Sequence, residues 1–166
     1  MRRHLAFAVL IGTLAAGALA AAASAVPPVH FTNTEDYSGS APCTGFNDMY
    51  QGHLDISGIT TFDQNGNPVQ DVVHISGWER NWRSDRPNVS ITAKRQFNVT
   101  FDYATNIEQD TGMIESQTAP GQGLLFHDVG NINLDDAAQQ VVAVHGPHDV
   151  FAGGQPVYCN ALLAVS

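Results

Sequence analysis

The chain has 166 residues and a formal net charge of −9, and 43% of its residues are hydrophobic. Residues 1–25 hold Arg2 and Arg3 but no acidic residue, so residues 26–166 carry five basic against 16 acidic residues, a net charge of −11. Such a chain lacks the basic surface that a general nucleic-acid binder needs. Its length fits one domain, and its apolar fraction excludes a disordered protein.

Residues 1–25 have the organisation of a secretory signal peptide. Arg2 and Arg3 give a positive start, an uncharged Ala- and Leu-rich stretch runs from Leu5 to Ala23, and Ala23-Ser24-Ala25 is an A-x-A cleavage site. An uncleaved membrane anchor is the alternative, but the second half of the stretch is weakly hydrophobic and no positive cluster follows it. We therefore expect a secreted, extracellular protein without a stable membrane anchor, whose residues 26–166 form a single β-barrel domain.

The remainder of the chain is typical of an all-β protein. Alternation with a period of two recurs between turns rich in Gly, Asn, Asp and Pro, with almost no helical periodicity. In chain order, the predicted strands are His30–Tyr37, Leu54–Phe62, Val69–Trp82, Val89–Tyr103, Gly112–Thr118, Gly123–Leu134, Gln139–His145 and Pro156–Val165. The count is seven or eight, depending on whether the first of them forms. Short turns join most of them, which predicts an antiparallel up-and-down meander.

Two of these strands carry most of the pattern. In Val89–Tyr103 the odd-numbered positions are mostly apolar and the even-numbered positions are polar, an arrangement that a helix could not bury on one side. In Val69–Trp82, Val73 and Ile75 differ in parity from Trp78 and Trp82, so we expect a bulge near Gly77 that returns all four to one face. Asn65-Gly66 predicts the hairpin turn between the second and third strands.

The two cysteines bear on the closure of the sheet. Cys43 and Cys159 form an even pair in an exported chain, which predicts one disulfide, with two free thiols as the alternative. The link would join segments near the two ends of the domain. Because closure removes exposed strand edges, we favour a closed barrel, while a two-sheet β-sandwich would give the same alternation.

The chain also carries a series of turn and strand motifs that are familiar together. They are Cys43-Thr44-Gly45, residues 62–67, His74 in a strand, Pro120-Gly121-Gln122-Gly123, His127-Asp128-Val129-Gly130, Gly146-Pro147-His148-Asp149 and Cys159 near the end. With these motifs the chain resembles small secreted β-proteins of actinobacteria that are largely uncharacterised. The resemblance implies a meander barrel similar in architecture to lipocalins or to allene-oxide-cyclase and dirigent proteins. Fold alone does not give function.

A basic and aromatic segment is the main candidate binding site. All five basic residues of 26–166 lie between positions 80 and 95, and two tryptophans are interleaved with them. Arg95, Trp78, Trp82 and Arg80 are candidate contacts for a small anionic or aromatic ligand, since Arg pairs with carboxylates and stacks on rings. The interpretation that we favour is a surface hairpin on which these cations pair with Glu79, Asp85 and other nearby acids. Arg95 has the parity of the apolar face and would need a partner there, as a structural lock or as a ligand contact, unless a bulge turns it outward.

His127, His145, His148 and Asp149 are weak candidates for a metal site. Residues 145 and 148 have opposite parity in a strand, and nothing in the spacing demands a metal ion. Turn chemistry, with Asp149 bonded to local backbone, explains the same residues. We expect no metal and no other cofactor.

No catalytic motif is present, and the sequence identifies no catalytic residue and no oligomeric state. Three functions remain open. The first is a secreted, disulfide-closed barrel that binds a small ligand or a cell-surface component. The second is an extracellular barrel enzyme of the cyclase or isomerase type, and the third is a structural or interaction protein with a filled core. A non-enzymatic role is favoured.

Overall fold

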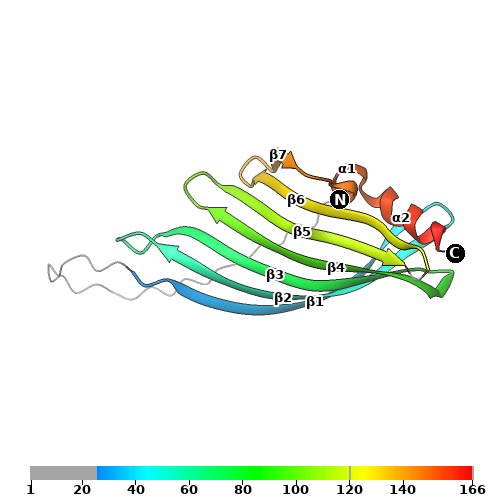
Figure 1. Ribbon diagram of the computed structural model, residues 1–166. Helices are drawn as coiled ribbons and strands as arrows, with labels where there is room; N and C mark the ends of the chain where they lie inside the picture. The colour runs from blue at the N-terminus through cyan, green and yellow to red at the C-terminus, as the bar shows by residue number, and fades with distance from the viewer. Residues whose placement is uncertain (1–25, 120, 166) are drawn as a thin grey trace.

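The computed structural model describes residues 26–119 and 121–165, so the predicted signal peptide lies outside the described residues. The described chain forms seven strands followed by two helices (Figure 1). The strands are β1 (Val29–Cys43), β2 (Phe46–Phe62), β3 (Pro68–Arg83), β4 (Arg86–Asp102), β5 (Ile107–Ala119), β6 (Gly123–Asp135) and β7 (Gln140–His145). The helices are α1 (Asp149–Gly153) and α2 (Gln155–Ala164).

The seven strands form one antiparallel sheet in which each strand pairs with its neighbours in sequence, in the order β1 to β7. This confirms the predicted all-β meander. The predicted closure into a barrel is not confirmed, because β1 and β7 are the two edges of an open sheet. β7 is short, and no described strand follows it that could bridge to β1.

The prediction of a last strand over Pro156–Val165 is wrong, because these residues belong mainly to α2. Gly154 precedes the helix with φ of 63°, a conformation that interrupts an extended chain, and Pro156 lies in the first turn, where its missing N–H costs nothing. Tyr158, Ala161 and Leu162 then recur at helical spacing and pack toward the sheet.

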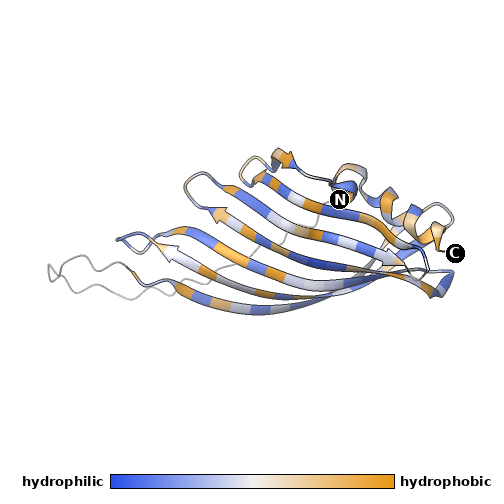
Figure 2. Ribbon diagram, viewed as in Figure 1, coloured by the Kyte–Doolittle hydropathy of each residue, from blue (hydrophilic) through white to orange (hydrophobic). Residues whose placement is uncertain are grey.

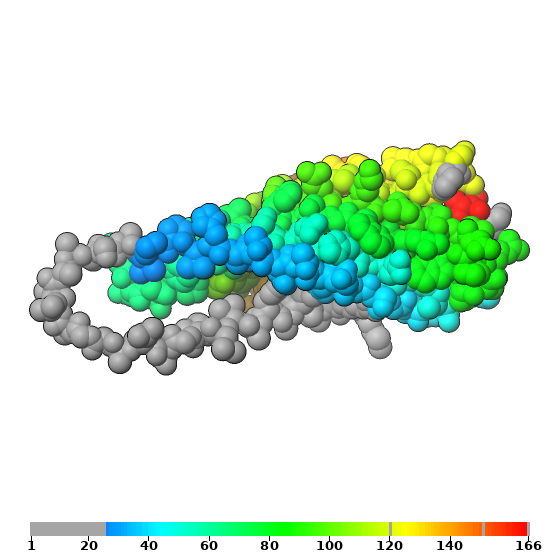
Figure 3. Space-filling view, turned by 90° about the horizontal axis from the view of Figure 1, so that it is seen from below, coloured from blue at the N-terminus to red at the C-terminus, as the bar shows by residue number. Residues whose placement is uncertain are grey.

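α2 covers one end of one face of the sheet, which we call the inner face. A hydrophobic core forms there from Phe46, Ile91, Ala119, Phe126, Ala161 and Leu162. Figures 1 and 3 show α2 at one end of the elongated molecule, and Figure 3 shows β1 to β4 running along its length. Among the described residues, no helix is both long and apolar enough to cross a lipid bilayer.

Cys43 and Cys159 form the predicted disulfide, with their Cα atoms 5.7 Å apart. The bond joins the end of β1 to α2 rather than to a last strand. It therefore holds the helix against the covered end of the inner face.

Alternation along the strands separates the inner face from the opposite, outer face (Figure 2). In β4, Ile91 and Ala93 are buried while Thr92 and Lys94 between them are exposed, as predicted. The expected bulge near Gly77 is wrong, because β3 stays in register through this position with both neighbouring strands. Gly77 is instead a place of close packing, where an added Cβ would collide with the carbonyl oxygen of His53.

Candidate functional site

Arg95 lies on the inner face, as its parity predicted, and it is ion-paired there. Its Nη2 atom donates hydrogen bonds to Oε2 of Glu79 at 2.9 Å and to Oε2 of Glu115 at 3.1 Å. The Arg95 side chain is 23% exposed, whereas both carboxylates are buried. Two buried carboxylates that share one half-buried cation need further hydrogen bonds to offset their desolvation.

Two tyrosines supply these bonds. The hydroxyl of Tyr37 in β1 donates to Oε2 of Glu79 at 2.8 Å, and the hydroxyl of Tyr158 in α2 donates to Oε2 of Glu115 at 2.6 Å. The ring of Tyr37 occupies the space where a side chain at Gly52 would stand. We call Arg95, Glu79, Glu115, Tyr37 and Tyr158 the Arg95 cluster.

A β-bulge places Glu115 in this cluster. Lys94 pairs with Ser116 and Gln96 pairs with Met113, so Arg95 lies opposite two residues of β5, Ile114 and Glu115. The extra residue reverses the alternation of β5. Even-numbered residues such as Asp110 point to the inner face before the bulge, and odd-numbered residues such as Glu115 and Gln117 point to it after the bulge.

Buried amides extend the cluster toward the helix-covered end. The Asn81 amide donates to Oε1 of Glu79 at 3.1 Å and to the Asp48 carboxylate at 3.3 Å, and Nε2 of Gln117 donates to Oδ1 of Asn81 at 3.0 Å. Gln155 of α2 also donates to Asp48, at 3.2 Å. The network ties the helix to the sheet through polar contacts as well as through the core.

Burial sets the protonation of this layer. Burial raises the pKa of Glu115 to about 7, although the guanidinium of Arg95 opposes the shift. Burial likewise raises the pKa of Asp48 to about 6. The pKa of Arg95 also lies above its ordinary value, because Glu115 and Glu79 outweigh the cost of burying its charge. Glu115 is therefore protonated in part of the molecules near neutral pH.

Three buried atoms of this layer have no hydrogen-bond partner among the described residues: Nε of Arg95, Oε1 of Glu115 and Oε1 of Gln117. Glu115 is 4% exposed and Gln117 is fully buried. Buried polar atoms in folded proteins are normally satisfied, so each exception needs an explanation. A water molecule can meet one donor and two acceptors, because it donates two hydrogen bonds, whereas a hydroxyl group can accept from the donor and donate to one acceptor.

Beyond the Arg95 cluster, on the side away from α2, the inner face becomes apolar. Ile75, Phe97, Val73 and Val99 occupy neighbouring positions of β3 and β4 there and are half-buried. None of them belongs to the core that α2 covers. We call these four residues, with Phe101, the apolar section.

Acidic groups border the far half of the apolar section, because Asp110 pairs with Val99 in register and both Asp71 and Glu108 pair with Phe101. The hydroxyl of Tyr103 donates to Oδ2 of Asp71 at 2.8 Å. Burial raises the pKa of Asp110 to about 7, and the nearby carboxylates of Glu108 and Asp136 raise it further. Apolar residues thus lie between two groups of acids.

The four residues that the sequence nominated for ligand binding do not form one site. Trp78, Arg80 and Trp82 share the outer face, and the Arg80 guanidinium lies over the Trp82 ring at 5.3 Å from its centroid. Trp78 is next to His53 and Lys94 in register and is 41% exposed. Arg95 points to the other face.

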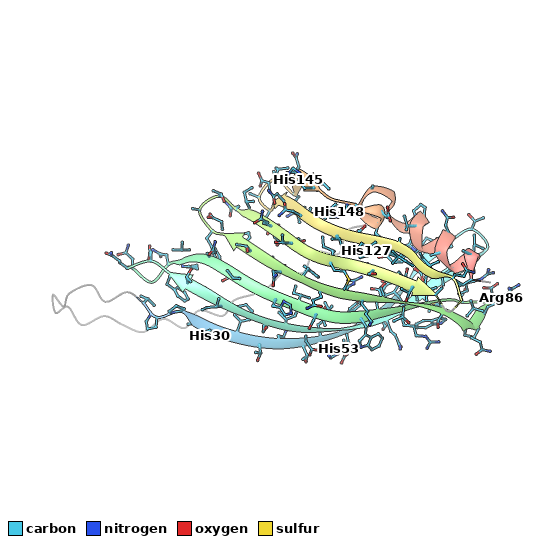
Figure 4. The ribbon with its side chains drawn as sticks, in the orientation of Figure 1. His30, His53, Arg86, His127, His145 and His148 are labelled. Carbon is cyan, nitrogen blue, oxygen red and sulfur yellow. A yellow bond between two sulfur atoms is a disulfide. The ribbon has the colours of Figure 1, made fainter. Side chains whose placement is uncertain are left out.

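Two further basic residues lie near the hairpin that joins β3 and β4. Arg83 pairs with Asp85 at 2.7 Å, and Arg86 lies at the tip of the hairpin (Figure 4).

The outer face is hollowed beside Trp78. A hollow of about 490 Å³ lies over β1, β2 and β3, and a second of about 300 Å³ shares Thr32, Ser57 and His74 with it. His53 contacts Asp36 through Nδ1 at 2.7 Å and Asp55 through Nε2 at 3.4 Å. His74 contacts Oδ1 of Asn98 through Nδ1 at 3.0 Å.

The weak metal candidates make local backbone contacts. Oδ2 of Asp149 accepts a hydrogen bond from the backbone N–H of His127 at 3.2 Å, and Nε2 of His148 contacts the backbone oxygen of His145 at 3.2 Å. Figure 4 shows the three histidines on the β6–β7 side, away from His30 and His53. Within the described ranges, no three His, Cys, Asp or Glu side chains are arranged to hold a metal ion.

The sequence indicated Glu79 as one of several acids that could pair with the basic residues, but not its place on the inner face beside Arg95. Strict alternation from Val73 through Ile75 and Gly77 reaches Glu79 when no bulge is assumed. Glu115 could not be found in this way, since its orientation depends on the bulge in β5. Tyr158 was assigned to a strand.

Comparison with protein-family models, with curated proteins and with solved structures gives no match to this chain. The function therefore has to be argued from the geometry of these two faces.

Proposed function

We propose that this is a secreted binding protein for a small uncharged amphiphile, which it holds on the inner face of the sheet. The polar group of the ligand would contact the Arg95 cluster, and its apolar part would lie along the apolar section. The observation that carries the proposal is the set of three unpartnered buried atoms of Arg95, Glu115 and Gln117 next to half-buried apolar side chains.

The charge of the cluster favours an uncharged ligand over an anion. Arg95 is already paired with Glu79 and Glu115, so an incoming carboxylate would meet two carboxylates around one cation. Placing like charges together in a buried site is unfavourable. A hydroxyl or amide group could instead use the free donor and acceptors without adding charge.

A purely structural role explains less of the site. A structural lock accounts for the pairing of Arg95 with its two carboxylates. It leaves the donor and acceptors of the same layer to be met by water, whereas the polar group of a bound ligand would meet them directly, and unmet hydrogen bonds of buried groups are costly.

One observation favours an enzyme as the second candidate. Asp110 and Glu115 both have a pKa raised by burial to about 7; Glu115 lies at the start of the apolar section, next to Arg95, and Asp110 lies opposite Val99. Groups with such pKa values suit general acid–base catalysis. An extracellular isomerase or cyclase would then act on the same amphiphile.

Calorimetric titration of residues 26–166 with octanol and with octanoate tests the proposal. We expect octanol to bind at least about tenfold more tightly, equivalent to about 1.4 kcal/mol. Gln117→Leu, which removes one acceptor, should weaken octanol binding, whereas Gln96→Leu is the matched control on the exposed outer face of β4. Equal or tighter binding of octanoate would overturn the proposal, and so would the absence of octanol binding. Conversion of a bound ligand would favour the enzyme.

A further inference from the structure

We infer that the outer face of β1, β2 and β3 is a second binding surface, independent of the inner face, and that it takes a neutral carbohydrate chain. The inference rests on three features of this face: the chemistry of its side chains, its shape and an exposed tryptophan.

The side chains of this face offer both donors and acceptors in rows that cross the strands. The register aligns Thr34, Asp55, Ser76 and Gln96 in one row and Thr32, Ser57, His74 and Asn98 in the next. These are hydroxyl, carboxylate, amide and imidazole groups, and neither row contains Lys or Arg. Such a set matches a ligand with many hydroxyl groups, which both donate and accept hydrogen bonds.

The shape of the face suits an extended ligand. The two hollows share Thr32, Ser57 and His74, so they are parts of one shallow, open groove over β1 to β3. Its larger part has a volume of about 490 Å³. The groove is open to solvent along its length, as a chain that continues beyond it would require.

Trp78 adds the flat apolar face of an indole ring beside this groove. It follows Ser76 by two residues on the same face of β3, a distance of about 7 Å along the strand. The residue is 41% exposed although its neighbours are polar, so the face of its ring is open to a ligand in the groove. A pyranose ring presents C–H groups on its flat side and hydroxyl groups around its edge, so it could stack on Trp78 while its hydroxyls contact the rows.

Two polar side chains of the surface are held in place before any ligand arrives. His53, next to Trp78, is fixed by Asp36 at 2.7 Å, and His74 in the groove is fixed by Asn98 at 3.0 Å. Side chains that are already oriented lose less entropy on binding. The exposed carboxylates of Asp36 and Asp55 disfavour an anionic chain in the groove, whose lining contains neither Lys nor Arg, and Lys94 lies outside the groove, opposite Trp78.

Tryptophan fluorescence gives a direct test, because Trp78 and Trp82 are the two tryptophans of the chain and both lie on this face. We would titrate residues 26–166 with neutral hexasaccharides built from glucose, N-acetylglucosamine, mannose or xylose, and with oligogalacturonate as the anionic probe. We expect at least one neutral chain to bind, and oligogalacturonate to bind at least about tenfold more weakly. Absence of binding to every neutral chain, or tighter binding of the anionic chain, would overturn the inference.

Two variants locate the site. Trp78→Ala should weaken binding of the best neutral chain at least about tenfold, measured by calorimetry, whereas Trp82→Ala lies four residues further along the strand and should change it less than about threefold. His74→Ala should also weaken binding, which tests the groove if the Trp78 variant does not fold. An unchanged affinity in both Trp78→Ala and His74→Ala would refute the assignment. Gln117→Leu on the inner face should have no effect, and loss of glycan binding in that variant would contradict two independent sites.

Discussion

The inner and outer faces of the sheet are built from the same strands but differ in chemistry and in the role proposed for them. Lys94 and Arg95 show the difference most directly, because they are adjacent residues with the same charge. Lys94 is exposed on the outer face, whereas Arg95 is held between two buried carboxylates on the inner face. Water solvates the charge of Lys94, whereas the charge of Arg95 is stabilised by its two carboxylate partners. We therefore expect the inner face to determine stability and the outer face to tolerate substitution.

The disulfide should have the largest effect on stability, because it anchors the helix that covers the inner face. The double variant Cys43→Ser/Cys159→Ser releases a link between residues 116 apart. Loop-closure entropy predicts a loss of about 4–5 kcal/mol in the free energy of unfolding. Urea denaturation would measure it, and the double variant Ser38→Ala/Ser40→Ala on the exposed side of β1 is the control. A loss below about 1 kcal/mol would show that the disulfide does not constrain the unfolded chain.

Removal of the buried cation should come next. Arg95→Met leaves Glu79 and Glu115 buried together without a counter-charge, which should cost about 3–5 kcal/mol. Lys94→Met makes the same substitution one residue away on the outer face and should change stability by less than about 0.5 kcal/mol. Urea denaturation of the two variants compares the faces directly. Equal effects would contradict the contrast between them.

A similar pair of variants tests the packing of α2. Leu162 is fully buried in the core and Leu163 is 49% exposed. Leu162→Ala should destabilise the protein by about 2–5 kcal/mol, because it removes buried methyl groups and leaves a cavity. Leu163→Ala should cost far less. Thermal unfolding would show the ranking, and a larger loss for Leu163→Ala would mean that the helix packs with a different face.

The last prediction concerns pH dependence, and it arises from buried acids of the inner face. Burial raises the pKa of Asp48 to about 6 and those of Asp110 and Glu115 to about 7, so the folded state keeps protons that the unfolded chain has lost. The free energy of unfolding should therefore fall as pH rises from about 5 to about 7, and the penalty is complete above that range. Calorimetric melting temperatures across this range would measure the trend.

A variant assigns the pH effect to a residue. Asp110→Asn should flatten the dependence, because its amide does not titrate. Asp149→Asn, at an exposed position where the amide oxygen can still accept the hydrogen bond from the backbone N–H of His127, should leave it unchanged. A protein that becomes more stable as pH rises through this range would show that these carboxyls are charged when buried.

Local pattern accounts for much of the fold. The alternation of β4, the Asn65-Gly66 turn and the antiparallel order of the strands depend on residues close in sequence, and all were predicted correctly. The pairing of Cys43 with Cys159 followed from their number. The inward position of Arg95 followed from parity. The signal peptide and the resemblance to actinobacterial proteins stay predictions.

Tertiary structure decided the features that make up the two candidate sites. The bulge that turns Glu115 toward Arg95 exists only in the pairing of β5 with its neighbours, so no alternation within one strand reveals it. The run from Pro156 to Val165 is short and apolar, and such runs form a strand or a helix according to what they pack against. Trp78 and Trp82 lie on the outer face because Gly77 packs closely against β2 instead of forming a bulge. The sequence by itself determined the alternation of each strand, and contacts between distant segments decided which side chains meet.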